Sequence, residues 1–179
     1  MNLYTKFAQK EHSPGRRIVA TLLVGPIFLI LLPYVVIVVG PALDQRMGLE
    51  GFRVGAANTA LGGLMMLVGF FFGFWSIYAQ LTRGRGTPLP VMPTQELLTR
   101  GPFAYCRNPM TLGTILAYLG LAIIVGTVAG IAIVLLLGAL LILYLKRMEE
   151  GELAERFGDA YLQYKREVPF IIPRLPKRK

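Results

Sequence analysis

The sequence predicts an all-α integral membrane protein with four transmembrane helices, of which the last two form a tight hairpin, followed by a C-terminal cytoplasmic amphipathic helix. Of the 179 residues, 54% are hydrophobic and only 16% are charged, which is too apolar for a soluble domain of this length. The net charge of +9 sits in clusters beside the apolar runs, where lysines and arginines orient membrane helices. This pattern argues against a nucleic-acid partner, and we expect one membrane domain over residues 1–179.

The first predicted span covers residues 18–39, behind the cationic segment 1–17. Its length suffices for a bilayer core of ~30 Å at ~1.5 Å per residue. The run is longer than the apolar part of a signal peptide and no small-residue cleavage site follows it, so we expect a retained helix. Pro26 and Pro33 are expected to kink it.

The second predicted span covers about residues 58–78 and follows a short loop, 41–57, whose charges cancel. Small residues recur through its length and permit close approach of another helix; they are Gly62, Gly63, Gly69 and Gly73.

The apolar run 110–145 is too long for one span and slightly short for two. Gly126, Thr127 and Gly130 mark a fold-back, so we expect a hairpin of two short helices, 110–125 and 128–145. A re-entrant loop followed by one span is the alternative.

The cations predict the orientation. The N-terminal segment, the connection 80–108 and the tail 146–179 each carry a net charge of +3, whereas the first loop and the hairpin turn carry none. Under the positive-inside rule, both termini, the connection and the tail are expected in the cytoplasm.

A polar segment, 100–113, lies against the start of the third span. Its prolines and glycines predict a shaped turn, and irregular backbone at a membrane boundary usually lines a site. Arg107 is either a snorkelling cation or the partner of a bound anion.

The tail begins with Glu149 and Glu150, where the fourth span leaves the membrane. They are either a solvated helix start paired with Lys146 and Arg147 or part of a site, because the hairpin returns them to the same edge as the polar segment. Apolar side chains then recur at steps of four and three, which predicts the amphipathic helix; they are Leu153, Phe157, Tyr161, Tyr164 and Val168.

These two stretches resemble the membrane-embedded methyltransferases of the isoprenylcysteine carboxyl methyltransferase and phospholipid methyltransferase type. The matching residues are Gly101, Pro102, Tyr105, Arg107 and Pro109 in the first stretch, and Glu149, Glu150, Leu153, Phe157, Gly158, Tyr161, Tyr164, Val168 and Pro169 in the second. The stretch 84–90 also looks like bacterial members. Ala104 replaces a frequent arginine, and Asn108 replaces a frequent histidine, which removes a titratable group but keeps hydrogen bonding.

The resemblance implies a methyltransferase in a bacterial inner membrane that uses S-adenosyl-L-methionine. Arg107 would take the cofactor's carboxylate, and Glu149 or Glu150 its ammonium or ribose, while tyrosines would contact the adenine. The expected catalytic residues are Arg107, Asn108 and Glu150. The expected cofactor-binding residues are Gly101, Tyr105, Arg107, Asn108, Pro109, Gly113, Glu149, Glu150 and Tyr161.

No protein nucleophile or metal is expected. Methyl transfer needs mainly alignment and exclusion of water, so Cys106 is read as a packing residue. One cysteine and one histidine, His12, form no metal-ligating cluster.

The expected partners are the bilayer and a hydrophobic, membrane-partitioned acceptor, like the carboxylate of an isoprenylcysteine. A phospholipid amine or a small hydrophobic thiol or amine is the alternative acceptor, and a non-catalytic scaffold or lipid-binding protein is the alternative class. The sequence leaves the oligomeric state open.

Overall fold

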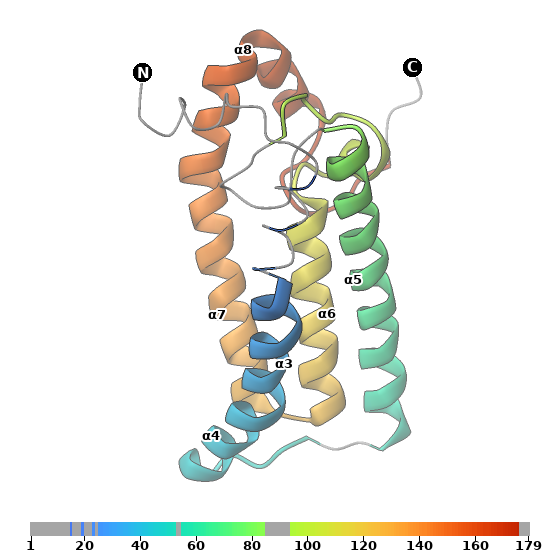
Figure 1. Cartoon of the computed structure of the whole chain (residues 1–179). Helices are drawn as coiled ribbons and strands as arrows, with labels where there is room; N and C mark the ends of the chain where they lie inside the picture. The colour runs from blue at the N-terminus through green and yellow to red at the C-terminus, as the bar shows by residue number, and fades with distance from the viewer. Residues whose placement is uncertain are drawn as a thin grey trace. The chain divides into compact units, whose positions relative to one another are not determined.

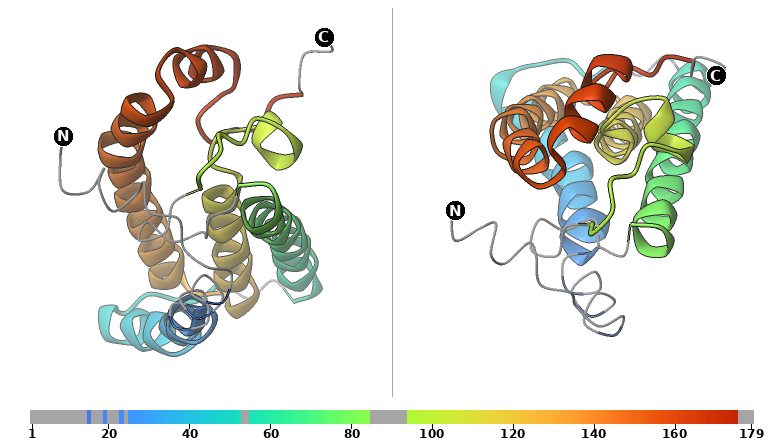
Figure 2. Two further views of the ribbon diagram at one scale, coloured as in Figure 1. Left: turned by 45° about the horizontal axis from the view of Figure 1, so that its top comes forward. Right: turned by 90° about the horizontal axis from the view of Figure 1, so that it is seen from above.

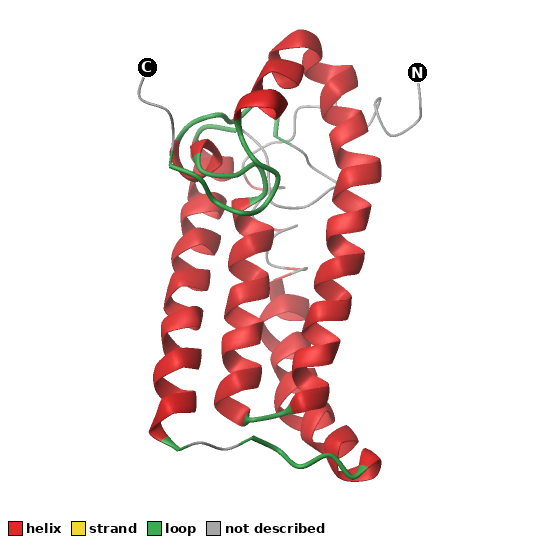
Figure 3. Cartoon of the chain, turned by 180° about the vertical axis from the view of Figure 1, so that it is seen from behind, coloured by secondary structure: helices red, strands yellow, loops and turns green. Residues whose placement is uncertain are grey.

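The computed structural model describes Gly15, Val19, Leu23 and residues 25–52, 55–84 and 94–175. Within these ranges every regular element is a helix, as Figure 1 and Figure 3 show, which confirms the all-α fold class. Contacts divide the chain into two compact units. We call Gly25–Gly73 with Thr111–Ile142 the span unit, and Met1–Val24, Phe74–Met110 and Leu143–Lys179 the motif unit.

The chain is an integral membrane protein. Within the described ranges, three helices are long and apolar enough to cross a membrane, and they are Leu29–Met47, Ala56–Thr82 and Val128–Glu167. Pro109–Val125 is a shorter apolar helix. About 20 residues cross the hydrocarbon core, so the apolar part of the helix Val128–Glu167, residues 128–145, is long enough to span the membrane by itself. We therefore place the charged residues that follow residue 145 outside the membrane.

The first helix continues further than the sequence predicts. Two π-helical turns, Ile27–Leu31 and Val35–Val39, flank α3 (Leu32–Tyr34), and α4 (Gly40–Met47) follows without a break. Residues 41–47 are therefore helical, and the prediction that the loop begins at residue 41 is wrong. Pro41 is near the start of α4, directly after a π-helical turn, and a proline inside a helix donates no backbone hydrogen bond. Most of residues 18–24 lie outside the described residues.

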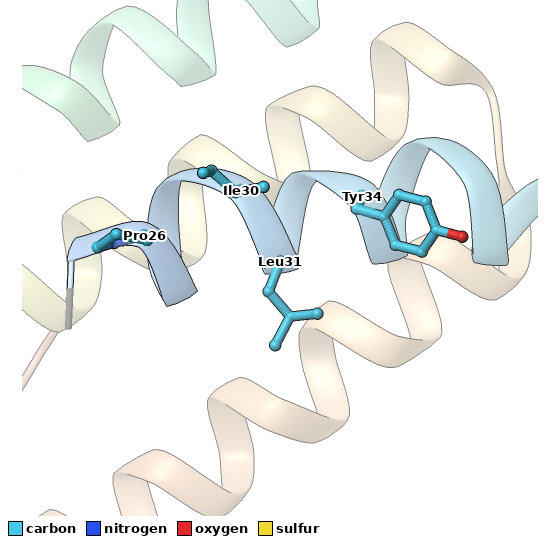
Figure 4. A pocket seen from close by; sticks show the side chains of 4 residues that line it. All are labelled: Pro26, Ile30, Leu31 and Tyr34. Carbon is cyan, nitrogen blue, oxygen red and sulfur yellow. The ribbon is translucent and has the colours of Figure 1, made fainter. Parts of the chain in front are cut away.

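An open apolar pocket lies along this first helix. Its lining residues are Pro26, Ile30, Leu31 and Tyr34, which come from successive turns (Figure 4).

Glycines bring α5 (Ala56–Thr82) against α6 (Pro109–Val125) in the span unit. A Cβ atom at Gly62 would overlap the Gly120 carbonyl, and one at Gly69 would overlap the Gly113 carbonyl and the Ala117 amide. Small residues at these positions therefore permit backbone contact between the helices, as predicted for the second span.

The predicted hairpin of α6 and α7 (Val128–Tyr144) is confirmed, and its turn is held by the first helix. Gly126 turns the chain with a φ of 75°. The buried Asp44 carboxylate accepts hydrogen bonds from Thr127 Oγ1 at 2.6 Å and from the amides of Val128 and Ala129 at 3.1 and 2.7 Å. A carboxylate here satisfies free N–H groups and complements the helix dipole of α7.

The tail helix is bent in the motif unit. A π-helical turn, Leu145–Glu149, leads from α7 into α8 (Glu150–Glu167). The predicted amphipathic helix is present, but Gly158 has φ 53° and ψ −132° and divides it into two segments, a change of direction that Figure 1 and Figure 2 show. The bend occurs at glycine because other residues rarely adopt this conformation.

Candidate functional site

The polar segment forms a single 3-10 turn, Gly101–Ala104, before α6 begins at Pro109. Gly101 opens the turn with a φ of 65°, a conformation that favours glycine. Tyr105 follows, and its ring centroid lies 5.9 Å from that of Trp75 in α5. The aromatic contact and the glycine together give this segment a defined path.

The C-terminal residues 168–174 run beside this segment and hold it by its backbone. The amide of Arg107 donates to the Pro169 carbonyl at 2.9 Å, and the amide of Asn108 donates to the Phe170 carbonyl at 3.1 Å. The amide of Arg174 returns a hydrogen bond to the Tyr105 carbonyl at 3.0 Å. The two stretches that the sequence pointed to are therefore side by side in the motif unit.

A tyrosine of α8 adds a further link. The Tyr164 hydroxyl donates to the Phe103 carbonyl at 2.7 Å, and its side chain is buried. Desolvation raises the pKa of the Tyr164 hydroxyl, which keeps it protonated and able to donate.

Three charged side chains meet at the centre of the site. Arg107 Nη2 lies 2.6 Å from Glu150 Oε1, and Lys165 Nζ lies 2.8 Å from Glu150 Oε2. The side chains of Arg107 and Glu150 are only 10% and 11% exposed. Arg107 Nη1 also donates to the Lys165 carbonyl at 2.7 Å. Glu150 is thus held between two cations, and the predicted convergence of Arg107 and Glu150 is observed.

Two buried polar atoms in this cluster have no hydrogen-bond partner among the described residues. They are Arg107 Nε and Glu150 Oε1. Glu150 Oε1 touches Arg107 Nη2, but that close approach is not aligned as a hydrogen bond. Buried polar atoms are nearly always satisfied, so such exceptions indicate a place for a further partner.

Tyr161 completes the cluster from α8. Its side chain is 1% exposed, and its hydroxyl lies close enough to the Glu150 carboxylate to interact with it. Burial first, and then the charge of Glu150, raise the pKa of the Tyr161 hydroxyl. A neutral tyrosine is therefore a donor to the buried carboxylate.

Glu149 is placed differently from Glu150. Its side chain is exposed, although surrounding protein atoms, with the charges of Glu152 and Glu150, raise the pKa of its carboxyl to about 7. At neutral pH this carboxyl is therefore only partly ionised.

Asn108 serves the C-terminal segment. Its Nδ2 donates to the Phe170 carbonyl at 3.2 Å, beside the hydrogen bond from its own amide. Pro109 is buried at the start of α6. Cys106 is fully buried, and desolvation raises the pKa of its thiol to about 11, so it is a packing residue as expected.

Packing between helices accounts for Gly113. It belongs to the span unit, where its Cβ position is closed by the Gly69 carbonyl and the Gly73 amide. Contact between α5 and α6 leaves no room for a side chain at residue 113, and its role in cofactor binding stays a prediction.

The sequence alone did not identify Phe170 and Lys165 as residues of the site. The guanidinium carbon of Arg107 lies 5.6 Å from the centroid of the Phe170 ring, and Lys146 Nζ lies 5.0 Å from it. An aromatic residue directly after Pro169 was the available signal for Phe170. No sequence signal pointed to Lys165, because its approach to Glu150 depends on the bend at Gly158.

Comparison with known proteins assigns the chain to a family. A family model described as phospholipid methyltransferase matches residues 57–160, which is more than half of the chain. A stretch of 79 residues is 34% identical to the cobalt-zinc-cadmium resistance protein CzcN of Cupriavidus metallidurans and covers 44% of this chain. The chain spans only 36% of the length of that curated relative. On the family match, this chain belongs to the phospholipid methyltransferase family.

Proposed function

We propose that this protein transfers the methyl group of S-adenosyl-L-methionine to a hydrophobic acceptor dissolved in the membrane. The observation that carries this proposal is the pair of unpartnered atoms, Arg107 Nε and Glu150 Oε1. One is a cationic donor and the other an anionic acceptor, and they come from the two separate stretches. A ligand that has both a carboxylate and an ammonium would satisfy both.

The residues present fit that cofactor. Arg107 would hold its carboxylate, and Glu150 or the exposed Glu149 would hold its ammonium or ribose hydroxyls. Tyr105 offers a ring surface beside Trp75 for the adenine. When bound, the cofactor supplies a methyl group already activated by the positive sulfur.

The chain's own residues then need only bind and orient. The Arg107, Glu150 and Lys165 cluster is fixed by ion pairs and by Tyr161, and residues 168–174 cover the polar segment by backbone hydrogen bonds. A fixed, poorly hydrated cluster aligns reactants and excludes competing water. Proton transfer by Asn108 is not required by this proposal.

The family description supports a phospholipid amine as acceptor, and an isoprenylcysteine-like carboxylate or a small hydrophobic thiol or amine fits the same chemistry. The positive clusters support a location of both termini and the site in the cytoplasm. The membrane proposed for the chain is a bacterial inner membrane. Metal handling, suggested by the name of the relative, finds no support: the described residues contain no group of three His, Cys, Asp or Glu suited to a metal ion.

Binding of S-adenosylhomocysteine to the purified chain in maltoside micelles tests the proposal. We expect a measurable heat in calorimetry and a higher melting temperature, because a ligand that prefers the folded state stabilises it by mass action. Absence of both at millimolar ligand would overturn the enzyme reading and leave a scaffold or lipid-binding role.

A further inference from the structure

Two apolar side chains stand exposed beside the candidate site. Ile172 is 78% exposed and Leu175 is 82% exposed, and no other large apolar side chain among the described residues is as exposed. Even Leu23, in the first predicted span, reaches only 72%. Such exposure at two positions of one short segment indicates an apolar partner that covers them.

The backbone of this segment is fixed at two points. The Phe170 carbonyl accepts a hydrogen bond from the amide of Asn108 at 3.1 Å. The amide of Arg174 donates to the Tyr105 carbonyl at 3.0 Å. Ile172 lies between these two anchors in the sequence, so its side chain is presented from an ordered backbone next to the polar segment.

The length of α6 places this segment at the edge of the membrane. α6 has 17 residues and is therefore about 25 Å long, which is shorter than a hydrocarbon core of ~30 Å. Its first residue, Pro109, accordingly lies at the boundary of that core or inside it. Residues 105–108 come directly before Pro109, and the C-terminal segment is hydrogen-bonded to them. Ile172 and Leu175 are thus presented at the level of the lipid interface.

The charge of the same stretch is wholly positive. Residues 168–179 contain no carboxylate side chain, and their cations are Arg174, Lys177, Arg178 and Lys179. The last three lie outside the described residues. The exposed Arg174 guanidinium donates from Nη2 to the Glu167 carbonyl at 2.6 Å and has further N–H groups. Basic residues beside exposed apolar side chains favour a surface of anionic lipid.

A second copy of the chain is a poorer fit for this surface. In a symmetric contact the same cations would face each other, and like charges held together at an interface oppose association. An anionic membrane supplies both the apolar layer and the counter-charge.

We propose that the segment 172–175 docks on the surface of an anionic phospholipid membrane, with Ile172 and Leu175 among the acyl chains and Arg174 among the phosphates. The amide of Arg107 donates to the Pro169 carbonyl, so docking also steadies the polar segment that carries Arg107. The lipid around the site thereby regulates it. Docking does not depend on the proposed function, whereas its effect on cofactor binding rests on that function.

The direct test measures the depth of residue 172 in nanodiscs made of phosphatidylcholine with or without phosphatidylglycerol. The full chain with Ile172→Cys carries a nitrobenzoxadiazole fluorophore, which spin-labelled lipids quench on contact. The label is selective because Cys106 is buried, and the unsubstituted parent should take up no dye. Asp159→Cys is the matched control, because this exposed position lies about 13 Å along α8 from its start.

We expect lipid quenching of the probe at 172 to be about threefold stronger in anionic than in neutral nanodiscs. It should fall at high salt, because surface attraction is screened. The probe at 159 should be quenched weakly in both lipids. Leu175→Ser should lower the quenching at 172, whereas Leu162→Ser, which removes an exposed leucine from α8, should leave it unchanged.

The effect on the cofactor site is measured by calorimetry with S-adenosylhomocysteine. The parent should bind it about threefold more tightly in anionic than in neutral nanodiscs. The double variant Ile172→Ser, Leu175→Ser should lose that difference, and Leu162→Ser should keep it. Equal affinity of the parent in the two lipids would overturn the regulatory part. If the parent binds no S-adenosylhomocysteine in either lipid, the proposed function fails, and the quenching still decides whether the segment docks.

Several results would overturn the docking itself. They are absence of lipid quenching at residue 172, equal quenching there in neutral and anionic nanodiscs, and equal quenching of the probes at 172 and 159. Loss of quenching on addition of inorganic phosphate at constant ionic strength would also overturn it, because the cations would then serve a free anion rather than a lipid surface.

Discussion

Arg107 Nη2 lies 2.6 Å from Glu150 Oε1, and this ion pair joins the polar segment before α6 to the first residue of α8. Both side chains are about nine-tenths buried. Each residue therefore neutralises the other before any ligand arrives, although Arg107 Nε and Glu150 Oε1 still have no hydrogen-bond partner among the described residues. Stability and ligand binding are consequently coupled at these two positions.

Removing either partner of this pair should destabilise the protein. Arg107→Ala or Glu150→Ala leaves the other charge poorly compensated, and we expect each to lower the free energy of unfolding by about 2–3 kcal/mol. The double variant should lose less than the sum of the two. Melting in micelles measures this, with Arg147→Ala as the exposed-cation control.

The same two variants should lose S-adenosylhomocysteine binding in calorimetry at a temperature where they remain folded and monodisperse. Normal binding by both would show that the ligand pocket lies elsewhere and that the pair is only structural.

The bend in α8 should be required for the cluster. Gly158→Ala places a Cβ on a residue with φ 53°, so we expect a loss of about 1–3 kcal/mol in unfolding free energy and weaker S-adenosylhomocysteine binding as Lys165 moves from Glu150. Gly151→Ala is the matched control, because this glycine lies in the same helix and its Cβ would meet no atom within 4 Å. It should be neutral or slightly stabilising. Equal behaviour of the two variants would contradict a role for the bend.

Asn108 should act by hydrogen bonding. Asn108→Ala removes the 3.2 Å hydrogen bond to the Phe170 carbonyl, and we expect a loss of ~1–3 kcal/mol in stability or ligand binding. Asn108→His can donate to the same carbonyl and should retain most of both.

The pH profile of the Asn108→His protein decides between two roles. A profile that superimposes on the parent's supports hydrogen bonding alone. A new limb near the reference histidine pKa of ~6.5 would show that a histidine here works as a base. An Ala variant that matches the parent would remove Asn108 from the site.

The buried Cys106 thiol should resist modification. Its pKa is raised by desolvation to about 11, so at pH 8 the folded protein should show no maleimide adduct by mass spectrometry, whereas the denatured protein should react. Because the folded state keeps its proton to higher pH, stability should fall as pH rises from about 9, the ordinary value, towards 11. Rapid labelling of the folded chain would contradict the burial of this thiol.

The sequence by itself determined the helical membrane fold and the residues that carry charge at the site. A single apolar run in a membrane satisfies its backbone N–H and C=O groups by forming a helix. The predicted helices 110–125 and 128–145 differ from α6 and α7 by one residue at each outer end. Arg107 and Glu150 were identifiable because charges at the ends of apolar helices are costly unless they are used.

Only the tertiary structure decided how those charges are paired. Glu150 and Lys165 would lie ~22 Å apart along a straight helix, and their 2.8 Å contact exists because Gly158 bends α8. Likewise, the loop charge Asp44 becomes a buried partner of the hairpin turn because the first helix continues through Pro41. Periodicity and hydrophobicity describe one segment at a time, whereas these contacts depend on backbone angles and packing between segments distant in the chain.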